Sequence, residues 1–586
     1  MLAKARLTAM TWIAITCTFL SHCPDSMAQD ESMNPPIGTY DRPGNKKQSR
    51  SVTYATNGMA TTSDLRATQA ALKILQAGGS AVDAAIAANA VLGVVEPMSC
   101  GIGGDLFSIC WSPEDKKLTG LNASGRSPRT ISIAKLKDLD PEMAYIPTFG
   151  PLAWSVPGCV SGWHDLHQRY GKLPWKDIFQ PAIRLADEGF PVAPVIAGYW
   201  KAAESRLKET PEATSTFLVN GKAPQAGDIF RNPNLAATYR RIAEFGSKDF
   251  YEGKIAKEIV RYSDTQNNSF LRSEDLKIHR NEWVEPVSTN YRGYDVWELP
   301  PNGQGIAALQ ILNLIEPHDV KSMGWGSPEW SHLFIESKKL AFADRAKFYA
   351  DMNMADVPLE PLISKEYAAE RAKLFDPDKA LVGVPAGDPK LVNGDTIYLC
   401  VVDKDRNCCS LIQSNYWGFG SARVAGNLGF AIQNRGALFS LDPEHLNCLE
   451  PKKRPFHTII PAMVTQDDKP IFVFGVMGGD MQPQGHAQVL VNWIDFGMNI
   501  QMAGDAARIR HDGSAKPTGV PEEENGGTAL LESGIPEATV KALQAKGHTT
   551  STGGSFGGYQ GILIDWERGI LQGATEARKD GAALGY

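Results

Sequence analysis

The sequence has no excess of positive charge and, after its first residues, no long apolar run. Lys and Arg number 59 against 66 Asp and Glu, a formal net charge of -7 at pH 7. Without an overall positive field the chain is not expected to bind nucleic acid. No stretch after the N-terminal 28 residues has the length and apolarity of a membrane helix. We therefore expect no stable membrane span once that segment is removed.

Cysteine is scarce, and no motif for a metal or a nucleotide is present. Nine cysteines occur in 586 residues; two lie in the N-terminal 28, so at least one of the other seven is unpaired within the chain. There is no C-x-x-C pair and no H-E-x-x-H. The glycines at 101–104 lack the G-x-G-x-x-G spacing and follow a predicted helix rather than a strand. We expect neither a metal nor another cofactor.

The N-terminus resembles an export signal. Lys4 and Arg6 precede a mainly apolar stretch from Leu7 to Leu20, and small residues around Ala28 offer a cleavage site. We read 1–28 as a signal peptide and 29–50 as a flexible leader. The protein is then exported, to the periplasm or the extracellular space. Retention of the segment as an anchor is the alternative.

Hydrophobic content of 43% and charged content of 21% indicate a globular chain. Ser63 is predicted to cap a helix from Asp64 to Ala77, and Ser80 one from Ala81 to Val95. A long amphipathic helix is expected from Ser331 to Met352. After Gly394 the pattern changes to strands at 396–402, 408–414, 459–464, 471–476, 560–565 and 568–573, with helices at 486–496 and 536–546. Such runs predict an α+β fold of layered sheets covered by helices.

One stretch, Asp395 to Asn407, carries two interpretations. Its first half is a strand rich in β-branched residues, and Asp403 to Asn407 is a turn leading to a second apolar run. It is either an ordinary core hairpin or a strand headed by a nucleophile after cleavage before Thr396. A threonine hydroxyl needs an adjacent base. A newly freed α-amine, with a pKa of about 7.7–8.0, can supply it.

Other motifs are weaker. Gly553 to Gly557 fits the hydrolase elbow G-x-S-x-G, but no histidine follows it, so we read a glycine-rich turn. Gly478 and Gly479 follow a predicted strand, and their backbone N–H groups can form an oxyanion hole or a plain strand-to-helix turn. His457, between basic and hydroxyl residues, is either structural or part of a pocket wall.

Taken together, the motifs resemble the γ-glutamyltransferase (γ-glutamyl transpeptidase, glutathione hydrolase) family of N-terminal-nucleophile hydrolases. The similarity runs from about Asn57 to Tyr586. It includes Gly78 to Ala85, Val156-Pro157-Gly158, Pro300-Pro301, Ala343-Asp344-Arg345, Thr396 with Val401 to Asp405, Lys453-Arg454-Pro455 and Gly478-Gly479.

The resemblance implies a four-layer αββα sandwich made as one precursor. The precursor cuts itself between Asp395 and Thr396 into a large subunit, 51–395, and a small subunit, 396–586, which share one domain. The substrate is a small-molecule amide with a γ-glutamyl or similar acyl group, for example glutathione. Its acyl group passes through an ester on Thr396 to water or to an amine. Ser414 falls where the family has a supporting threonine, and Gly478 and Gly479 hold the oxyanion.

The substrate pocket departs from the family pattern. The family's carboxylate-binding arginine falls at Ser124, with Arg126 two residues away. The aspartate that holds the α-amine falls at Leu438, and a leucine cannot pair with an ammonium. The family's other pocket residues fall at Thr458, His457, Arg435 and Tyr416. We expect these four residues and Arg126 to bind the substrate.

These departures resemble the divergent branch of the family that contains cephalosporin (glutaryl) acylases and oxamate amidohydrolase. The alternative function is therefore an acylase or amidohydrolase that acts on dicarboxylic monoamides lacking an α-amine. We hypothesise that Arg435, alone or with Arg126, receives a substrate carboxylate. A non-catalytic binding protein on the same scaffold is a third possibility, against which the intact Thr396 and the two glycines argue.

Overall fold

The computed structural model describes residues 50–384 and 395–586. The predicted signal peptide, 1–28, lies outside the described residues, as does the leader 29–50 apart from Arg50. The ten residues before Asp395 are also outside them.

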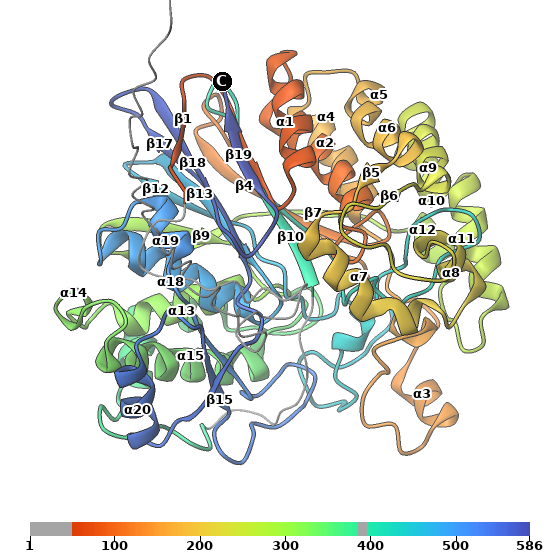
Figure 1. The fold of residues 1–586 in the computed structure, drawn as a ribbon. Coiled ribbons are helices and arrows are strands. Elements are labelled where there is room, and N and C mark those ends of the chain that lie inside the picture. Colours follow the sequence, from red (N-terminus) through yellow and green to blue (C-terminus); the bar gives the residue numbers. More distant parts are fainter. Residues whose placement is uncertain (1–49, 385–394) are drawn as a thin grey trace, which may run out of the picture. The chain divides into compact units, whose positions relative to one another are not determined.

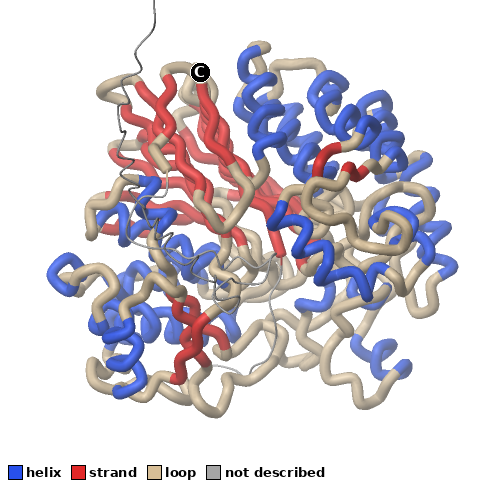
Figure 2. Tube along the Cα trace, viewed as in Figure 1, coloured by secondary structure: helices blue, strands red, loops and turns tan. Residues whose placement is uncertain are grey.

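Two seven-stranded sheets form the centre of the structure (Figures 1 and 2). The first sheet contains, in spatial order, β1 (Thr53–Ala55), β18 (Ile570–Thr575), β17 (Gly558–Asp565), β13 (Lys469–Met477), β12 (Ala462–Gln466), β9 (Tyr294–Glu298) and β8 (Val287–Tyr291). The second contains β19 (Ala582–Gly585), β2 (Met59–Thr62), β10 (Asp395–Val402), β11 (Cys408–Tyr416), β3 (Asp105–Ser112), β4 (Lys117–Ala123) and β7 (Glu282–Val284). Smaller sheets join β14 (Ile509–Asp512), β15 (Thr528–Leu531) and β16 (Thr549–Thr552), and β5 (Phe190–Pro191) with β6 (Ile229–Phe230).

Helices cover the outer face of each sheet (Figure 1). The second sheet is covered by α1 (Leu65–Gln76), α2 (Ala81–Val95) and α4 (Cys159–Tyr170), with α6 (Gln180–Glu188) packed on α2 and α9 (Pro233–Phe245) packed on α6. The first is covered by α13 (Gly305–Ile315), α18 (Met481–Ile494) and α19 (Ile500–Asp505), with α15 (Pro328–Phe348) packed on α13. The remaining α-helices are α3 (Ile133–Leu139), α5 (Trp175–Ile178), α7 (Pro194–Leu207), α8 (Pro211–Phe217), α10 (Ser247–Tyr251), α11 (Lys254–Thr265), α12 (Ser273–Lys277), α14 (Val320–Met323), α16 (Leu359–Leu362), α17 (Lys365–Ala372) and α20 (Glu537–Ala545). This is the predicted αββα sandwich.

Strand β10 is buried on both faces, and its side chains alternate between two cores. Ile397, Leu399 and Val401 pack in the cluster beneath α1 and α2. Tyr398, Cys400 and Val402 pack between the two sheets. The period of two along a strand produces this division. It also explains why the strand contains almost no polar residue after Thr396.

The second sheet joins both sides of the predicted cleavage point. β10 pairs with β2, which precedes it by more than 300 residues, and β2 pairs in turn with the C-terminal strand β19. Segments before and after residue 395 therefore share one hydrogen-bonded sheet. Two chains produced by a cut there would stay bound through this sheet and its cores.

Two predicted caps have different outcomes. Ser80 caps α2 as expected, in a reciprocal capping box with Asp83. The predicted cap of α1 is wrong by one residue. Asp64 accepts the N–H of Arg66 as the cap, whereas the Ser63 hydroxyl donates to Glu96. The charged carboxylate of Asp64 accepts a helix N–H more strongly than the hydroxyl of Ser63 would, and that hydroxyl already has a buried acceptor in Glu96.

The long helix α15 is not amphipathic as predicted. Its residues from Ser331 to Ala346 are all buried, and it ends at Phe348 rather than at Met352. The polar side chains that suggested a solvent face are paired inside the protein. Lys339 lies 2.9 Å from Glu336, and Arg345 lies 2.7 Å from Asp480. Charge in the sequence therefore marks an internal ion-pair network here.

The strand predicted at 459–464 begins only at Ala462. Two backbone N–H groups in the preceding residues bond to groups outside the sheet. His457 N donates to Asn302 O, and Ile460 N donates to the side-chain oxygen of Gln482. Residues 457–460 thus form a separate segment beside the sheet.

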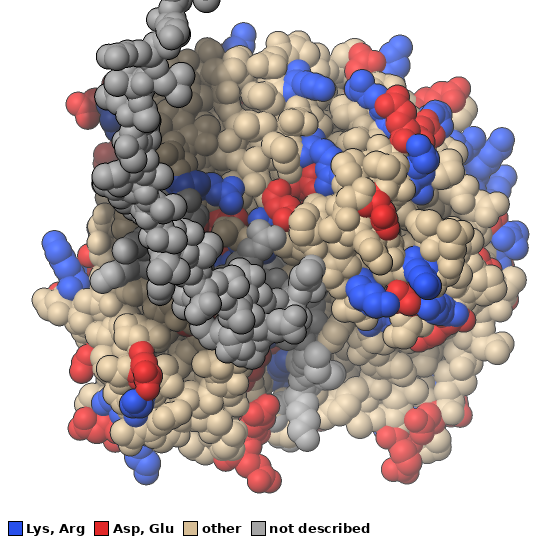
Figure 3. All heavy atoms as spheres, viewed as in Figure 1, with Lys and Arg blue, Asp and Glu red and all other residues tan. Residues whose placement is uncertain are grey.

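None of the seven cysteines within the described residues forms a disulfide. No helix in that part of the chain combines the length and the apolarity needed to cross a bilayer. On the face shown in Figure 3, basic and acidic side chains are interspersed over the described residues.

Candidate active site

The predicted nucleophile lies at the start of β10. Thr396 is 1% exposed, and its Oγ1 donates a hydrogen bond of 3.2 Å to Ser414 Oγ on β11. Ser414 Oγ also accepts the backbone N–H of Tyr416 at 2.8 Å. The β10–β11 register shifts between Asp395 and Ile397, so the peptide bond before Thr396 lies at an irregularity of the ladder. The structure thus brings Thr396 and Ser414 together as predicted.

The two glycines follow the end of β13 in the facing sheet. Gly478 and Gly479 have φ values of +117° and +58°, a region that favours glycine. A Cβ on Gly478 would lie 3.0 Å from the Cα of Gly557. Upstream, Gly475 is covered by the ring of Tyr398, since a Cβ there would lie 2.6 Å from it. The first residues of β10 and the end of β13 therefore pack on each other between the two sheets.

A cavity lies beside these elements. Its lining includes Tyr416, Leu438, Phe456, Thr458 and Gly479. Tyr416 is the strand partner of Asp395, so the cavity lies next to the start of β10. Tyr416 has a φ of +78°, an unfavourable conformation for an aromatic residue. Such strain often marks a functional site, and here it carries the tyrosine ring to the cavity wall.

Two side chains that precede the predicted cleavage point hold the glycine loop and the Thr458 segment together. Gln304 Nε2 donates to the carbonyl oxygens of Thr458 and Gly479, at 2.7 and 2.9 Å. Arg345 Nη1 donates to Gln304 Oε1 and to Asp480, at 2.6 and 2.7 Å. Both side chains are at most 1% exposed. The two carbonyl oxygens that Gln304 binds lie more than 150 residues away in the chain, so the only signal for Gln304 in the sequence is its position just after Pro300-Pro301.

Arg435 lies behind the cavity wall. It is fully buried, its Nη1 donates to Thr458 Oγ1 at 2.8 Å, and its guanidinium lies 4.7 Å from the Tyr416 ring centre. Burial lowers the pKa of Arg435 to about 10. Its Nε and Nη2 are buried without a hydrogen-bond partner in the described chain, although Nε lies 3.7 Å from Asp105.

His457 is fixed against Asp105. Its Nε2 lies 2.6 Å from Asp105 Oδ2, and its Nδ1 accepts the N–H of Ile459 at 3.4 Å. Burial, followed by the charge of Arg435, lowers the pKa of His457 to about 4. The imidazole is therefore neutral near pH 7, with its proton on Nε2. Asp105 also accepts Gly125 N and Gln433 Nε2, both within 2.9 Å.

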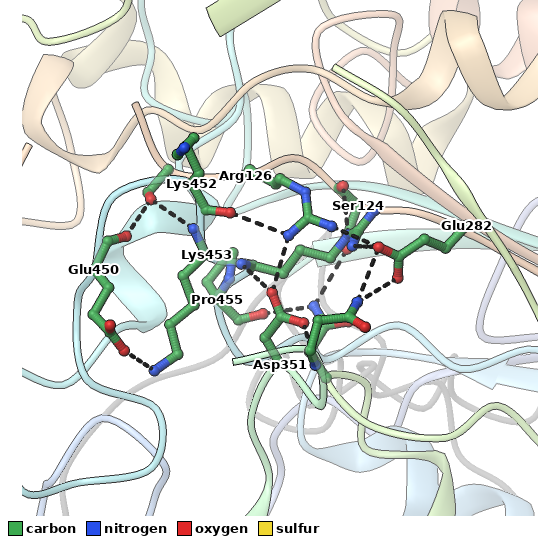
Figure 4. A network of polar contacts seen from close by, with 12 residues as sticks. Ser124, Arg126, Glu282, Asp351, Glu450, Lys452, Lys453 and Pro455 are labelled. Atoms are coloured by element: carbon green, nitrogen blue, oxygen red, sulfur yellow. Dashed lines mark hydrogen bonds and ion pairs between the residues drawn. The ribbon is translucent and has the colours of Figure 1, made fainter. Parts of the chain in front are cut away.

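The structure does not bring Arg126 to this cavity. Its guanidinium pairs with Glu282 at 2.5 Å and with Asp351 at 3.2 Å, and it donates to the carbonyl oxygen of Lys452 (Figure 4). It lines a different cavity, with Arg129 and His279. Ser124, which we predicted at the position of the family's arginine, donates a hydrogen bond of 2.6 Å to Asn122 Oδ1. Arg126 is thus part of a partly buried ion-pair network outside the cavity beside Thr396.

One cluster has the composition of a metal site. Ligand atoms of His332, Glu336 and His548 lie within 4.8 Å of one another, and all three residues are buried. His332 Nδ1 is hydrogen-bonded to His548 Nε2 at 2.7 Å, and the Lys339 ammonium lies 2.9 Å from Glu336. Burial, followed by Lys339, lowers the pKa of His548 to about 3. The donors are already paired with one another, and the adjacent ammonium opposes a bound cation.

Comparison with known proteins places this geometry in a family. The model of the family described as Gamma-glutamyltranspeptidase matches residues 67–586. The chain is 39% identical over 525 residues to the glutathione hydrolase-like YwrD proenzyme of Bacillus subtilis, covering 89% of this chain and 96% of that protein. It is 34% identical over 543 residues to the oxamate amidohydrolase proenzyme of Klebsiella pneumoniae, covering 91% and 99%.

A solved structure agrees with these relatives. The cephalosporin acylase from Bacillus halodurans superimposes with a TM-score of 0.85 at 42% identity, covering 92% of this chain and 98% of that one. Both sequence relatives are named proenzymes, which fits the position of Thr396 at the head of a buried strand. The protein is an N-terminal-nucleophile hydrolase or acyltransferase, and it belongs to the gamma-glutamyltranspeptidase family.

Proposed function

We propose that this protein cuts its own chain between Asp395 and Thr396 and then hydrolyses or transfers acyl groups of small amides through Thr396. The observation that carries the proposal is the buried Thr396–Ser414 hydroxyl pair beside a cavity lined by Gly479 and Thr458. The predicted signal makes it an exported enzyme, in the periplasm or outside the cell. Its large and small subunits would be 51–395 and 396–586.

The first step is the cut. The Thr396 hydroxyl attacks the carbonyl carbon of Asp395, and the peptide C–N bond gives way to an ester on Oγ1. Breaking the C–N bond frees the α-amine of Thr396; water then hydrolyses the ester, which leaves a carboxyl group on residue 395 and restores the Thr396 hydroxyl. The irregular pairing at residues 395–397 supports this step, because a peptide outside the regular ladder can be approached by its own side chain.

Catalysis uses the same hydroxyl. The freed α-amine accepts the proton of Oγ1 while Oγ1 attacks the amide carbonyl. Backbone N–H groups of Gly478 and Gly479 would stabilise the oxyanion; one such donor contributes about 10²–10³ in rate. The C–N bond breaks, the proton passes to the leaving amine, and the acyl group stays on Thr396. Water then gives the acid, or an acceptor amine gives a new amide, and the hydroxyl is regenerated.

The cavity favours acyl groups without an α-amine over a γ-glutamyl group. The α-ammonium of a γ-glutamyl group needs an unpaired carboxylate. The cavity presents Leu438 at the position where we expect the family's amine-binding aspartate. The carboxylate of Asp480 is already paired with Arg345 and Lys516. The names oxamate amidohydrolase and cephalosporin acylase among the relatives agree with this preference.

Denaturing electrophoresis of the purified protein tests the cut. Wild type is expected as two chains and Thr396→Ala as one, whereas Thr396→Ser retains cleavage. A single uncut wild-type chain would refute the proposal. Hydrolysis of γ-glutamyl, glutaryl and oxamate amides by the processed enzyme then identifies the acyl group, and activity restricted to γ-glutamyl amides would refute the stated preference.

A further inference from the structure

One buried side chain, Asn447, ties together the walls of the cavity beside Thr458 and Gly479. Asn447 Nδ2 donates to the carbonyl oxygens of Leu438 and Pro517, at 2.7 and 2.8 Å. Asn447 Oδ1 accepts the N–H of Phe456 at 2.8 Å. Asn447 itself is fully buried. Because these partners come from three separate segments, the cavity walls are tied together in a built pocket.

The charged residues of the cavity leave an excess of positive charge. Arg345 and Lys516 both pair with Asp480, at 2.7 and 3.1 Å, and all three side chains line the cavity. Burial by itself raises the pKa of Asp480, but the two cations outweigh it and hold the pKa well below its usual range. Two cations thus face one carboxylate. An unbalanced charge in a partly buried site is unfavourable, and a bound anion offsets it.

Only one of these two cations is placed to meet a ligand. The Arg345 side chain is 1% exposed, bonded to Gln304 and stacked 3.7 Å over the Phe342 ring. The Lys516 side chain is 17% exposed and has a flexible stem. Its backbone is fixed in a turn, in which Lys516 N donates to Val520 O and Gly519 N donates to Lys516 O. The ammonium can therefore move toward the cavity while Asp480 keeps Arg345.

A hydroxyl lies in the same turn. Thr518 lines the cavity, and its Oγ1 is buried without a hydrogen-bond partner among the described residues. A buried hydroxyl with no partner is unfavourable unless a ligand completes it. Together, Lys516 and Thr518 offer a cation and an O–H donor to one anionic group. By contrast, Arg435 lies behind Thr458 and Tyr416, and Arg126 lines another cavity.

We propose that Lys516 and Thr518 form the subsite that binds a carboxylate at the far end of the acyl group, so that the preferred donors are monoamides of dicarboxylic acids. This inference rests on the proposed function, and it replaces Arg435 and Arg126 as the carboxylate receptor.

The experiment compares two acyl anilides of equal chain length, glutaryl-p-nitroanilide with a terminal carboxylate and pentanoyl-p-nitroanilide without one. Losing a charge-assisted hydrogen bond of about 1.5–3 kcal/mol corresponds to about ten- to hundredfold in kcat/KM. Lys516→Met is expected to lose this factor for the glutaryl substrate and to stay within about twofold for the pentanoyl substrate. Lys516→Arg retains most of the preference. Thr518→Val shows a smaller loss of the same kind.

Matched controls keep the outcomes distinct. Lys541 is an exposed lysine of α20, and Lys541→Met is expected to leave kcat/KM unchanged for both substrates. Two chains on a denaturing gel show that each variant has folded and processed. Equal loss on both substrates, or a glutaryl preference removed by Arg435→Met and not by Lys516→Met, would overturn the subsite and leave the proposed function standing. An uncut wild type inactive on both anilides would overturn both.

Discussion

Arg345 donates a hydrogen bond of 2.6 Å to the side-chain oxygen of Gln304, and through it the long helix α15 is connected to the active-site loops. Gln304 in turn donates hydrogen bonds to the carbonyl oxygens of Thr458 and Gly479. The first two residues precede Thr396 in the chain and the last two follow it. After processing, side chains of the large subunit would therefore hold the catalytic loops of the small subunit in place.

Replacing Gln304 tests this connection. Gln304→Leu removes both donors and leaves two buried carbonyl oxygens without them, at a cost of about 1–3 kcal/mol each in stability. We expect kcat to fall about ten- to hundredfold with a smaller change in KM, because the glycine loop loses its orientation. Steady-state kinetics and thermal unfolding measure both effects. Gln544→Leu, on exposed helix α20, is the control; an unchanged kcat in Gln304→Leu would contradict the positioning role.

Ser414 is expected to orient the nucleophile. Ser414→Ala removes the acceptor of the Thr396 hydroxyl and of Tyr416 N. Losing a buried hydrogen bond of about 1–3 kcal/mol predicts kcat about ten- to hundredfold lower, with slower appearance of the two chains. Ser414→Thr keeps the hydroxyl and is expected to retain most activity. If Ser414→Ala processed and turned over like wild type, Ser414 would have no part in either step.

Gly478 has both a conformational and a steric requirement. At a φ of +117°, with Gly557 Cα 3.0 Å from a new Cβ, Gly478→Ala must shift the loop. We expect a loss of about 1–3 kcal/mol in stability and most of the activity. Gly497→Ala is the matched control, because Gly497 has a φ of +63° with nothing within 4 Å of a new Cβ. Chemical unfolding and steady-state kinetics measure both variants. Equal losses of activity in Gly478→Ala and Gly497→Ala would contradict the role of the glycine loop.

His457 predicts a pH dependence of stability. Its pKa in the folded protein is about 4, below the ordinary value of about 6.5, so the unfolded chain binds the extra proton between these values. Stability therefore falls as pH decreases from about 6.5 to 4, by about 2 kcal/mol between pH 7 and 5.

Denaturant unfolding at pH 7 and pH 5 measures this change. Buried His279 and His486, whose pKa values are lowered to about 4 and about 3, add to the wild-type decrease. His457→Gln is expected to show a decrease smaller by the contribution of one group. An identical decrease in the variant and wild type would show that His457 does not titrate as described.

Local patterns predicted most elements of the fold. The strand after Thr396, the turn at Asp403 to Asn407 and the helix cap at Ser80 depend on neighbouring residues, and the structure confirms them. The errors occur where distant groups compete. Asp64 replaces Ser63 as a cap because Ser63 binds Glu96, and α15 loses its expected solvent face because Asp480 lies against Arg345.

The sequence by itself predicted layered sheets covered by helices, because strand and helix periods depend on neighbouring residues. Thr396 as the nucleophile, Ser414 as its supporting hydroxyl and the αββα arrangement were predicted through the resemblance of several motifs along the chain to one family. Only the tertiary structure decided which cations face the cavity. Arg126 and Arg435 are near the expected positions in the chain, but ion pairs on one side and the Tyr416 ring on the other separate them from it. Lys516 reaches the cavity through a turn that no local pattern connects to Thr396, since the contact depends on packing between segments more than 100 residues apart.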